Sequence, residues 1–405
     1  MSFTSLDQLL QQAVPTVAPA LVCRVEQGGQ LRYERSLGYI NPMLKRHPVT
    51  PATRFDFASL TKLFTTTACL RMVDAGLLDL DRAVGDWLPE FTGVRHIGPT
   101  EDPLLKTPAP VPPIWQAYTT GYDLAEITLR RLLTHTSGLP AWRNLFALFD
   151  TPPERHNALH RAEILRRQQV ALQAIAGFDL AYPPGAAYEY SDIGLILLGM
   201  VVTAASEERF LADALQHWIT APLRVGAHFI PTCLEIDDIA PTEFCAWRKR
   251  RLHGEVHDEN AAGLGGMAGH AGLFGTAQDL TRLGNLYLEG GRDLLRPATV
   301  AAAVTPHVIT AESGQPLQAG ADPASAIRRG LGWMLRSGPE PSCSLAFGPR
   351  SFGHTGFTGG SLWCDPDREL VVALLTNRVY HGRDPRPIAD LRVAVHRAVV
   401  EALTH

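Results

Sequence analysis

A serine and a lysine stand three residues apart in the stretch FDFASLTKLF, where they are Ser59 and Lys62. Residues three apart on a helix share a face, so the Lys62 amine can reach the Ser59 hydroxyl. A serine hydroxyl is a weak nucleophile at neutral pH and needs a neighbouring base, which a lysine becomes when burial or a nearby charge lowers its pKa. The start of a helix also offers free backbone N–H groups to a developing oxyanion. Alone, the same pair equally fits a polar helix start with a solvated lysine.

A second polar cluster, Tyr190-Ser191-Asp192, lies between a turn with the sequence PPG and an apolar helical segment. Asp192 can serve as the N-cap of that helix, and Tyr190 can be an aromatic residue of the core. By itself, this segment therefore indicates no particular chemistry.

A third cluster, His354-Thr355-Gly356, lies in the stretch FGHTGFTGG. Glycine lets a ligand approach the backbone closely at the edge of a strand. The backbone N–H of Phe357 is then a candidate second donor to an oxyanion. The alternative is a glycine-rich turn that only leads into a strand. A fourth segment, RRLLTHTSGLP, contributes only His135, for which we expect a structural role.

The elements that must position these residues follow a simple order along the chain. Strand patterns occur near both ends and helical patterns fill the middle. This order predicts an α/β (α+β) fold, in which a mainly antiparallel sheet is flanked by helices and carries a mostly helical inserted domain. We assign the sheet domain to residues 1–82 and 277–405, and the inserted domain to residues 83–276.

Individual elements are predicted from local patterns. A Gly28-Gly29 turn predicts an N-terminal hairpin, and a turn at Pro366-Asp367 predicts that two later strands are antiparallel. The other predicted elements are a short amphipathic helix in LDQLLQQAV, a strand in RFDFAS, a helix from Ser59 to about Ala75-Gly76, an irregular proline-rich loop over 97–122, a short helix in ITLRRLLTHTSGLP, helices over 155–177 and 192–217, a glycine-rich loop and then a helix in NAAGLGGMAGHAGLFGTAQDLTRLGNLYL, strands in GLGWMLR, SLAFG, GGSLWCDP and ELVVALLTN, and a helix in RPIADLRVAVHRAVVEALTH.

Composition and charge exclude several classes of partner. The 405 residues are 45% hydrophobic and 19% charged, with a net charge of −4, which is typical of a soluble globular protein. No clustered basic face indicates a nucleic-acid partner. The densest basic run, in WRKRRLHGEVHDEN, is followed at once by acidic residues, and we interpret it as a solvated surface turn.

The chain also lacks signals for membranes and disulfides. No run of about 18 or more apolar residues predicts a membrane span, and the N-terminus has no basic region before an apolar one, so we expect a cytoplasmic protein. The six cysteines are scattered without a CxxC pair, and we expect reduced, mostly buried thiols.

Taken together and in this order, the motifs resemble those of the serine β-lactamase and penicillin-binding protein superfamily. More narrowly, the chain resembles the class C β-lactamase-like serine hydrolases, which include D-alanyl-D-alanine carboxypeptidases, D-aminopeptidases and family VIII esterases. Ser59 and Lys62 match the S-x-x-K motif, and Tyr190 to Asp192 match Y-x-N with Asp in place of Asn. Residues 354–356 match K-T-G in its H-T-G variant. LLTHTSGLP and GGMAGHAGLFGTAQDL are also similar, and the resemblance runs from about residue 19 to the C-terminus.

The resemblance implies acyl transfer in two steps on a small ester, amide or peptide, without a metal or other cofactor. Ser59 would attack a carbonyl to form an acyl-enzyme, which water then hydrolyses. Lys62 and Tyr190 would share the proton transfers as the other catalytic residues. The backbone N–H groups of Ser59 and Phe357 would hold the oxyanion.

The substrate would contact Asp192, His354, Thr355, Gly356 and Phe357, and two of these positions depart from the family pattern. A histidine in place of the lysine of K-T-G is largely neutral at pH 7 and weakens selection for carboxylate-bearing β-lactams. A carboxylate at Asp192 favours a protonated Lys62 and repels anionic substrates. Both departures favour esterase, amidase or peptidase activity on neutral or cationic acyl groups.

Several alternatives stay open at this stage. One is a β-lactamase or D-alanyl-D-alanine carboxypeptidase proper, and another is an acyltransferase that passes the acyl group to an alcohol or amine. A third is a non-catalytic penicillin- or peptide-binding protein on the same fold, because fold alone does not fix function. The exact substrate and the oligomeric state are not readable from the sequence.

Two further groups of residues have a chemical and a structural interpretation. His257, Asp258 and His270 can be metal ligands, but their spacing fits no standard pattern such as H-E-x-x-H, so we expect them to structure a loop. Arg378 follows an apolar strand pattern and can bind a substrate carboxylate through both guanidinium arms. We expect instead that Arg378 is a surface residue.

Overall fold

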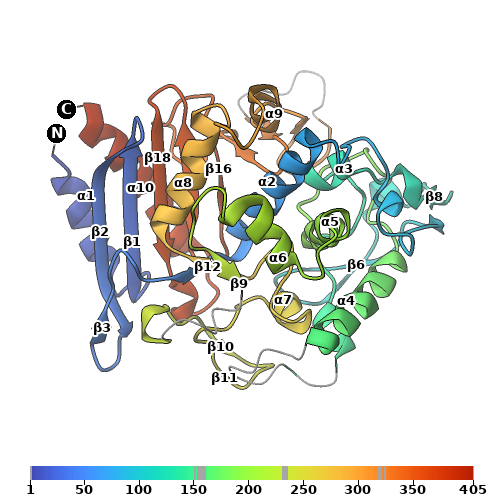
Figure 1. Ribbon diagram of the computed structural model, residues 1–405, viewed down its shortest axis with the longest axis horizontal. Coiled ribbons are helices and arrows are strands. Elements are labelled where there is room, and N and C mark those ends of the chain that lie inside the picture. The colour runs from blue at the N-terminus through green and yellow to red at the C-terminus, as the bar shows by residue number, and fades with distance from the viewer. Residues whose placement is uncertain are drawn as a thin grey trace.

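The computed structural model describes residues 2–149, 152, 161–229, 236–316, 322 and 325–404. Within these residues, a large antiparallel sheet lies at one end of the molecule and a mainly helical region at the other (Figure 1). Both termini lie beside each other at the sheet end. The predicted α/β architecture, with an antiparallel sheet flanked by helices, is confirmed.

The large sheet combines the first and last strands of the chain. Its order is β13-β14-β15-β16-β17-β18-β1-β2-β3, and neighbouring strands are antiparallel. The strands are β1 (Ala20–Gln27), β2 (Gln30–Asn41), β3 (Arg46–Pro48), β13 (Val308–Thr310), β14 (Ile327–Arg329), β15 (Met334–Leu335), β16 (Phe352–Thr355), β17 (Ser361–Asp365) and β18 (Leu370–Thr376). β18 and β1 lie in the centre, and every residue of β18 is buried.

The two hairpins predicted from turn residues are both present. Gly28 and Gly29 join β1 to β2 with φ angles of 58° and 70°, the left-handed values that a two-residue type I′ turn requires and that glycine adopts at low cost. The turn after Asp365 joins β17 to β18, which pair antiparallel.

Helices cover both faces of the sheet. α1 (Thr4–Ala13) and α10 (Arg386–Thr404) pack together on one face, and α8 (Ala277–Leu288) packs on the other (Figure 1). Each of the three presents an apolar stripe to the strands, as helical periodicity requires. The terminal helices were predicted from this periodicity, and both are confirmed.

The helical region surrounds α2 (Thr61–Asp74), which carries Lys62 in its first turn. α2 packs against α5 (Asp192–Ala205), and nearly every residue along α2 is buried. The other helices of this part of the chain are α3 (Leu129–Leu133), α4 (Arg161–Ala176), α6 (Leu211–Leu215), α7 (Glu259–Gly263) and α9 (Pro297–Ala303). Residues 155–160 of the predicted helix 155–177 lie outside the described residues.

The strand predicted in RFDFAS forms, but it joins a second, smaller sheet. β4 (Phe55–Asp56) pairs with β12 (Leu273–Gly275), and β12 pairs with β9 (His228–Phe229). This small sheet brings the segment before Ser59 against the glycine-rich segment that leads into α8. The small sheet therefore fixes where α2 begins.

Three predicted elements are wrong in detail. The helix predicted over 192–217 is two helices, α5 and α6, separated at Glu207, whose φ of 59° is incompatible with a helix. SLAFG is a turn, because Ser344 has a φ of 66° and its hydroxyl accepts the Ala346 N–H. The loop over 97–122 contains β6 (Thr100–Glu101) and β7 (Pro108–Ala109), which pair as a two-residue ladder. Two further short strands, β5 (Val94–Arg95) and β8 (Tyr122–Asp123), pair with each other at its borders.

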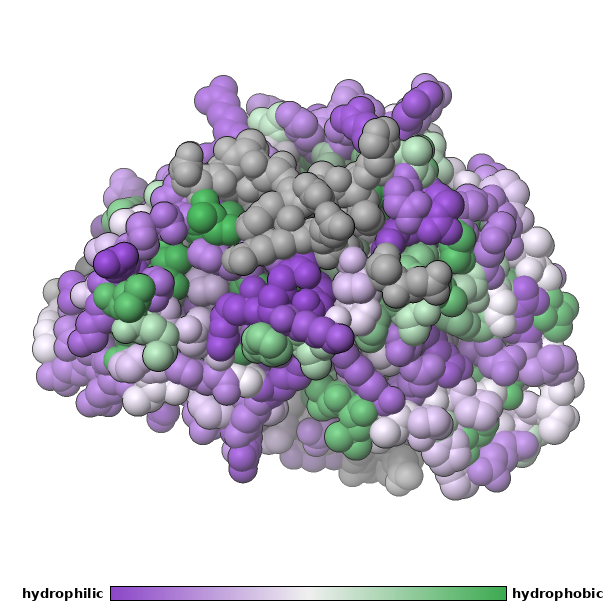
Figure 2. Space-filling model, turned by 90° about the horizontal axis from the view of Figure 1, so that it is seen from below, coloured by the Kyte–Doolittle hydropathy of each residue, from purple (hydrophilic) through white to green (hydrophobic). Residues whose placement is uncertain are grey.

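The surface and the thiols agree with the composition. No helix of the described residues is long and apolar enough to cross a bilayer. Figure 2 shows a face on which hydrophilic residues predominate and hydrophobic ones form small, separate groups. The free cysteines described are all buried, at positions 23, 69, 245, 343 and 364; Cys233 lies outside the described residues.

Because α5 packs closely against the glycine-rich loop, we expect alanine substitution to affect stability differently at two glycines of this helix. A Cβ at Gly199 would lie 2.8 Å from the backbone of Gly269, whereas a Cβ at Gly194 would meet side chains at no less than 3.6 Å. We expect Gly199→Ala to lower the free energy of unfolding by about 1–3 kcal/mol through overpacking. Gly194→Ala should leave it unchanged or raise it by up to about 1 kcal/mol. Urea unfolding measures both, and equal stabilities would contradict the close contact.

Candidate active site

Ser59 lies on a strained turn between β4 and α2. The turn is a 3₁₀ segment, Ala58–Leu60, in which Ala58 and Leu60 are buried and Ser59 is half-buried. Ala58 has a φ of 46°, a left-handed value that costs a non-glycine residue roughly 1–2 kcal/mol. Such strain persists only where surrounding contacts fix the backbone, and at this turn it presents the Ser59 side chain at the start of a helix.

Lys62 is buried directly behind Ser59. Its side chain is 1% exposed, and its Nζ lies 2.8 Å from Ser59 Oγ. The same ammonium donates to the carbonyl of His270 at 3.2 Å and forms an ion pair with Asp192 at 2.7 Å. These oxygen atoms suit a charged lysine, whose three protons all donate.

Tyr190 completes this group from the loop before α5. Its hydroxyl is hydrogen-bonded to both Ser59 and Lys62, and Nζ lies 4.9 Å from the centre of its ring. The ring also contacts His135 and His354, with centroid distances of 4.7 and 5.9 Å. The structure thus brings together the three residues predicted to be catalytic from segments more than a hundred residues apart.

The charges of this group favour a protonated Lys62. Burial acts to lower the pKa of Lys62, but the Asp192 carboxylate and the Tyr190 oxygen outweigh it and raise that pKa above its ordinary value. Burial also raises the pKa of Tyr190, an effect that Lys62 opposes and Asp192 reinforces. At neutral pH the resting site therefore holds an ammonium at Lys62, paired with Asp192, and a neutral phenol at Tyr190.

Asp192 is not the N-cap that one interpretation of the sequence allowed. Ser191 caps α5, because its hydroxyl accepts the Gly194 N–H at 3.0 Å. The backbone N–H of Ser191 donates to His135 Nδ1 at 3.0 Å. Asp192 is the first residue of the helix, and this leaves its carboxylate free to reach Lys62.

His354 and Thr355 end β16, and Gly356 begins the turn after it, so His354 is part of a strand rather than of a turn before it. His354 Nδ1 lies 2.8 Å from the carbonyl oxygen of Thr355. A carbonyl only accepts, so Nδ1 carries the proton. Burial lowers the pKa of His354 to about 3, helped by the charge of Lys62. His354 is therefore neutral at pH 7, as its residue type suggested.

The turn after His354 lies against the turn that carries Ser59. A Cβ at Gly356 would lie 2.6 Å from the carbonyl oxygen of Phe57, so only glycine permits this approach. The Phe357 ring stacks on the His257 ring with centroids 5.4 Å apart. The Arg378 guanidinium lies 4.6 Å from the centre of the Phe357 ring. The sequence predicted that a ligand approaches these glycines; the group that lies against Gly356 in the structure is the protein's own backbone.

The expectation that Arg378 is a surface residue is wrong. Arg378 is 5% exposed, and its guanidinium donates to the carbonyls of Phe357 and Asp384. Arg392 of α10 is also buried and donates to the carbonyls of Gly356 and Gly360 at 2.7 Å each. Both arginines hold the 356–360 turn. A signal existed for Arg392, which lies on the apolar stripe of a helix between Leu391 and Val395.

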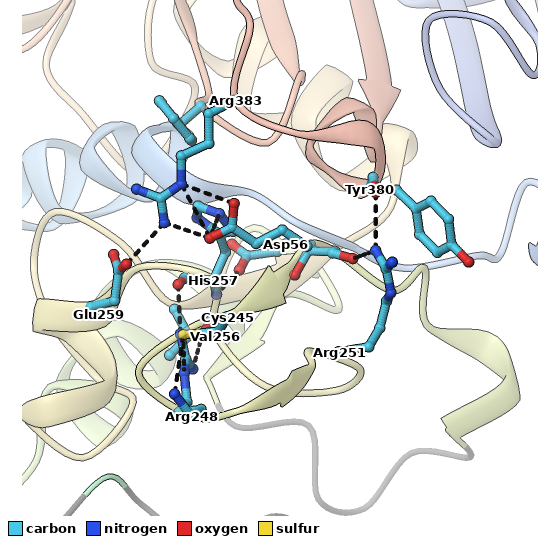
Figure 3. Close-up of polar contacts among 12 residues, drawn as sticks. Asp56, Cys245, Arg248, Arg251, Val256, His257, Glu259, Tyr380 and Arg383 are labelled. Atoms are coloured by element: carbon cyan, nitrogen blue, oxygen red, sulfur yellow. Dashed lines mark hydrogen bonds and ion pairs between the residues drawn. The ribbon is translucent and has the colours of Figure 1, made fainter. Parts of the chain in front are cut away.

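The segment 247–260 is also more buried than predicted. Arg248 is 5% exposed, and its guanidinium donates to the carbonyls of Val256 and His257 (Figure 3). Arg383 pairs with Glu243 and Glu259 in the same cluster. Residues 246–249 of the basic run do form a turn and Lys249 is exposed, but Arg248 is buried and Arg250 pairs with Glu255, so only part of the run is solvated.

The predicted trio His257, Asp258 and His270 does not come together as a unit. His270 Nε2 contacts Asp258 at 2.9 Å, whereas His257 Nε2 faces Glu243 at 3.2 Å. Instead, ligand atoms of Asp192, Asp258 and His270 lie within 4.8 Å of one another. The Lys62 ammonium already pairs with Asp192, and a cation beside it would be repelled, so these residues fit a structural and electrostatic role better than a metal site.

Comparison with known proteins agrees with this geometry. The family model described as Beta-lactamase matches residues 6–396. The N-acetylmuramyl-L-alanine amidase of Bacillus subtilis (strain 168) is 30% identical, in an alignment that covers 92% of this chain and 80% of that protein.

Solved structures show the same fold. The octameric penicillin-binding protein homologue from Pyrococcus abyssi superposes with a TM-score of 0.70 at 20% identity, covering all of this chain and 78% of that one. EstCE1, titled a hydrolase with promiscuous acyltransferase activity, has a TM-score of 0.68 at 23% identity, with 96% and 98% covered. The resemblance seen in the motifs is confirmed over nearly the whole length: this chain belongs to the β-lactamase family.

Proposed function

We propose that this protein is a serine acyl hydrolase that forms an acyl-enzyme on Ser59 and acts on a small ester or amide. The observation that carries the proposal is the contact of Ser59 Oγ with Lys62 Nζ at 2.8 Å, with the Tyr190 hydroxyl bonded to both. A nucleophile beside a proton acceptor and a buried cation is the arrangement that activates serine. The amidase relative from Bacillus subtilis supports cleavage of an acyl bond.

The charges indicate how the protons move. Lys62 is protonated and donates to Ser59 Oγ, so the Ser59 proton points toward Tyr190. Attack requires that Tyr190 first lose its own proton to solvent; the resulting phenolate, stabilised by the Lys62 ammonium beside it, takes the Ser59 proton as Oγ attacks the carbonyl carbon. The resulting phenol returns the proton to the leaving group as the tetrahedral intermediate collapses. Water then repeats the sequence on the acyl-enzyme and releases the acid.

The oxyanion of each tetrahedral intermediate would be held by two backbone N–H groups, those of Ser59 and Phe357. The contact of Gly356 with the Phe57 carbonyl supports this assignment, because it brings the two turns together. Removing one such donor costs roughly 3–4 kcal/mol of transition-state stabilisation in serine hydrolases.

Substrate charge would be selected by the residues around the nucleophile. Asp192 contributes a carboxylate, His354 is neutral, and Arg378 and Arg392 are occupied by backbone carbonyls. Arg329 lines a small pocket with Tyr190 and His354, but its guanidinium already donates to the Tyr188 hydroxyl and the Arg328 carbonyl. This favours neutral or cationic acyl groups, so we place esterase, amidase or peptidase activity above β-lactamase activity.

The acyl-enzyme predicts covalent labelling at one residue. A fluorophosphonate probe should label the native protein, with the added mass on the peptide that contains Ser59, and Ser59→Ala should abolish the label. Ser36→Ala, which removes a hydroxyl on β2, is the matched control and should label normally. A native protein that takes no label, or a label that persists in Ser59→Ala, would contradict the proposal.

The Lys62–Asp192 pair predicts the direction of a pH shift. The Asp192 carboxylate raises the pKa of both Lys62 and Tyr190, so Asp192→Asn should let either group lose its proton at lower pH. The rising limb of the plot of kcat/KM against pH should move to lower pH by about 1–3 pH units, the usual effect on a pKa of removing a charge at this distance.

The control for this shift is Asp123→Asn. Asp123 is an exposed carboxylate that caps the 3₁₀ turn Leu124–Glu126 through the Ala125 N–H, and asparagine caps a helix equally well. This variant should leave the limb close to its native position. An Asp192→Asn profile that stays in place or moves to higher pH would show that neither group controls the limb.

The site charges also predict a ranking of substrates. Purified protein should turn over short-chain nitrophenyl esters or D-amino-acid amides with a higher kcat/KM than penicillins or nitrocefin, because the β-lactams carry a carboxylate that meets no free cation. Measuring the panel with native protein and with Ser59→Ala separates enzymatic from background hydrolysis. Rapid β-lactam hydrolysis with poor ester turnover would reverse the ranking.

A further inference from the structure

Asp56 lies three residues before Ser59 and accepts hydrogen bonds from three separate segments. Its side chain is buried, with the residue 2% exposed. Carboxylate oxygen Oδ1 accepts the Ala58 N–H at 2.7 Å, and Oδ2 accepts the His257 N–H at 2.6 Å. Its backbone carbonyl accepts the Thr358 hydroxyl at 2.7 Å. The sequence indicated only a short strand here, and nothing assigned Asp56 a role.

The first contact holds the strained backbone before Ser59. Ala58 has a φ of 46°, and without an acceptor its buried N–H would be a second cost on top of that strain. The Asp56 carboxylate removes this cost and fixes the Phe57–Ala58 peptide, which is one peptide before the Ser59 N–H. The direction of the Ser59 N–H therefore depends on Asp56 through the conformation of Ala58.

The second contact fixes the turn that carries Phe357. Thr358 follows Phe357 directly, and its hydroxyl reaches back to the Asp56 carbonyl. On the other side of Phe357, Gly356 packs on the Phe57 carbonyl. The Phe357 N–H therefore lies between two residues that are both anchored to the segment 56–57.

The third contact reaches Phe357 from its side chain. The Asp56 carboxylate holds the backbone of His257 (Figure 3), and the His257 ring stacks on the Phe357 ring at an interplanar angle of 28°. All three hydrogen bonds of Asp56 therefore hold residues that flank or touch Ser59 and Phe357, whose N–H groups would face the oxyanion. A buried carboxylate with both oxygens used by backbone donors is a rigid anchor, because charge-assisted hydrogen bonds are short and strong.

We propose that Asp56 is a positioning residue that sets the spacing of the Ser59 and Phe357 N–H groups and so aligns the oxyanion site. The proposal rests on the proposed function, because it concerns the rate of acylation at Ser59. It assigns no contact between Asp56 and the substrate. A misplacement of about 1 Å at such a site costs on the order of 100-fold in rate.

Asp56→Asn tests the proposal with little change in shape. The amide keeps one acceptor oxygen but places an NH₂ group against one of the two backbone N–H groups. We expect kcat for a nitrophenyl ester to fall by about 100-fold while KM changes by less than about threefold, because the ground state does not use the oxyanion site. The rate of fluorophosphonate labelling should fall in parallel.

Glu26→Gln is the matched control. Glu26 is another buried carboxylate with three side-chain donors, the Thr281 hydroxyl, the Asn285 amide and the Arg24 guanidinium, and it lies on β1 away from the site. Its variant should lose thermal stability to a similar extent but keep kcat within about threefold. A folded Asp56→Asn protein with native kcat would overturn the proposal.

A second pair of variants covers the case in which Asp56→Asn does not fold. Thr358→Val removes only the hydroxyl that reaches Asp56, and Thr358→Ser restores it. We expect a fall in kcat of about 10-fold for the valine variant and recovery in the serine variant, and equal kcat values would overturn the proposal. Native protein that takes no label at Ser59 would defeat the proposed function itself, whereas normal labelling in both native and Asp56→Asn protein would defeat only the role of Asp56.

Discussion

The buried ammonium of Lys62 is the constraint on which the rest of the site depends. A lysine that is 1% exposed is destabilising by several kcal/mol unless its charge is paired and its protons are accepted. Asp192, Ser59 and the His270 carbonyl meet this requirement only when α2, the start of α5 and the glycine-rich loop are all in place. The contact of Gly199 with Gly269 allows that loop to approach α5. The same close packing of two glycines therefore helps to place the His270 carbonyl beside Lys62.

Local patterns were sufficient for the elements that carry the motifs. The Gly28-Gly29 hairpin, the terminal helices and the antiparallel pairing of β17 with β18 follow from turn residues and hydrophobic periodicity. The ordered motifs at Ser59, Tyr190 and His354 then pointed to a family whose fold brings them together. The neutral state of His354 and the charged state of Lys62 were also foreseeable, because each follows from residue type and one neighbour.

Local sequence patterns did not predict which charged residues are buried. Arg248 lies in the run predicted to be a solvated turn and Arg378 was predicted to be a surface residue, since hydropathy assigns an arginine to water unless a partner is known; the burial of Arg392 was not predicted. Their partners are backbone carbonyls, which leave no trace in the sequence. Asp56 is the extreme case, because the His257 N–H that it accepts lies 201 residues away. These residues set the geometry around the nucleophile, so the details of the site were less predictable than its identity.

The pairing of β1 with β18 has a consequence for how the chain folds during synthesis. The Ala20 N–H is bonded to the side chain of Asn377, 357 residues later. The ribosome therefore releases the N-terminal hairpin and the Ser59 segment long before the strand that covers β1 exists. Until residues 370–376 emerge, one edge of β1 has no partner, and such an edge can pair with other chains. Dependence on contacts this distant also slows folding, so the nascent chain spends most of its synthesis with its central strand exposed.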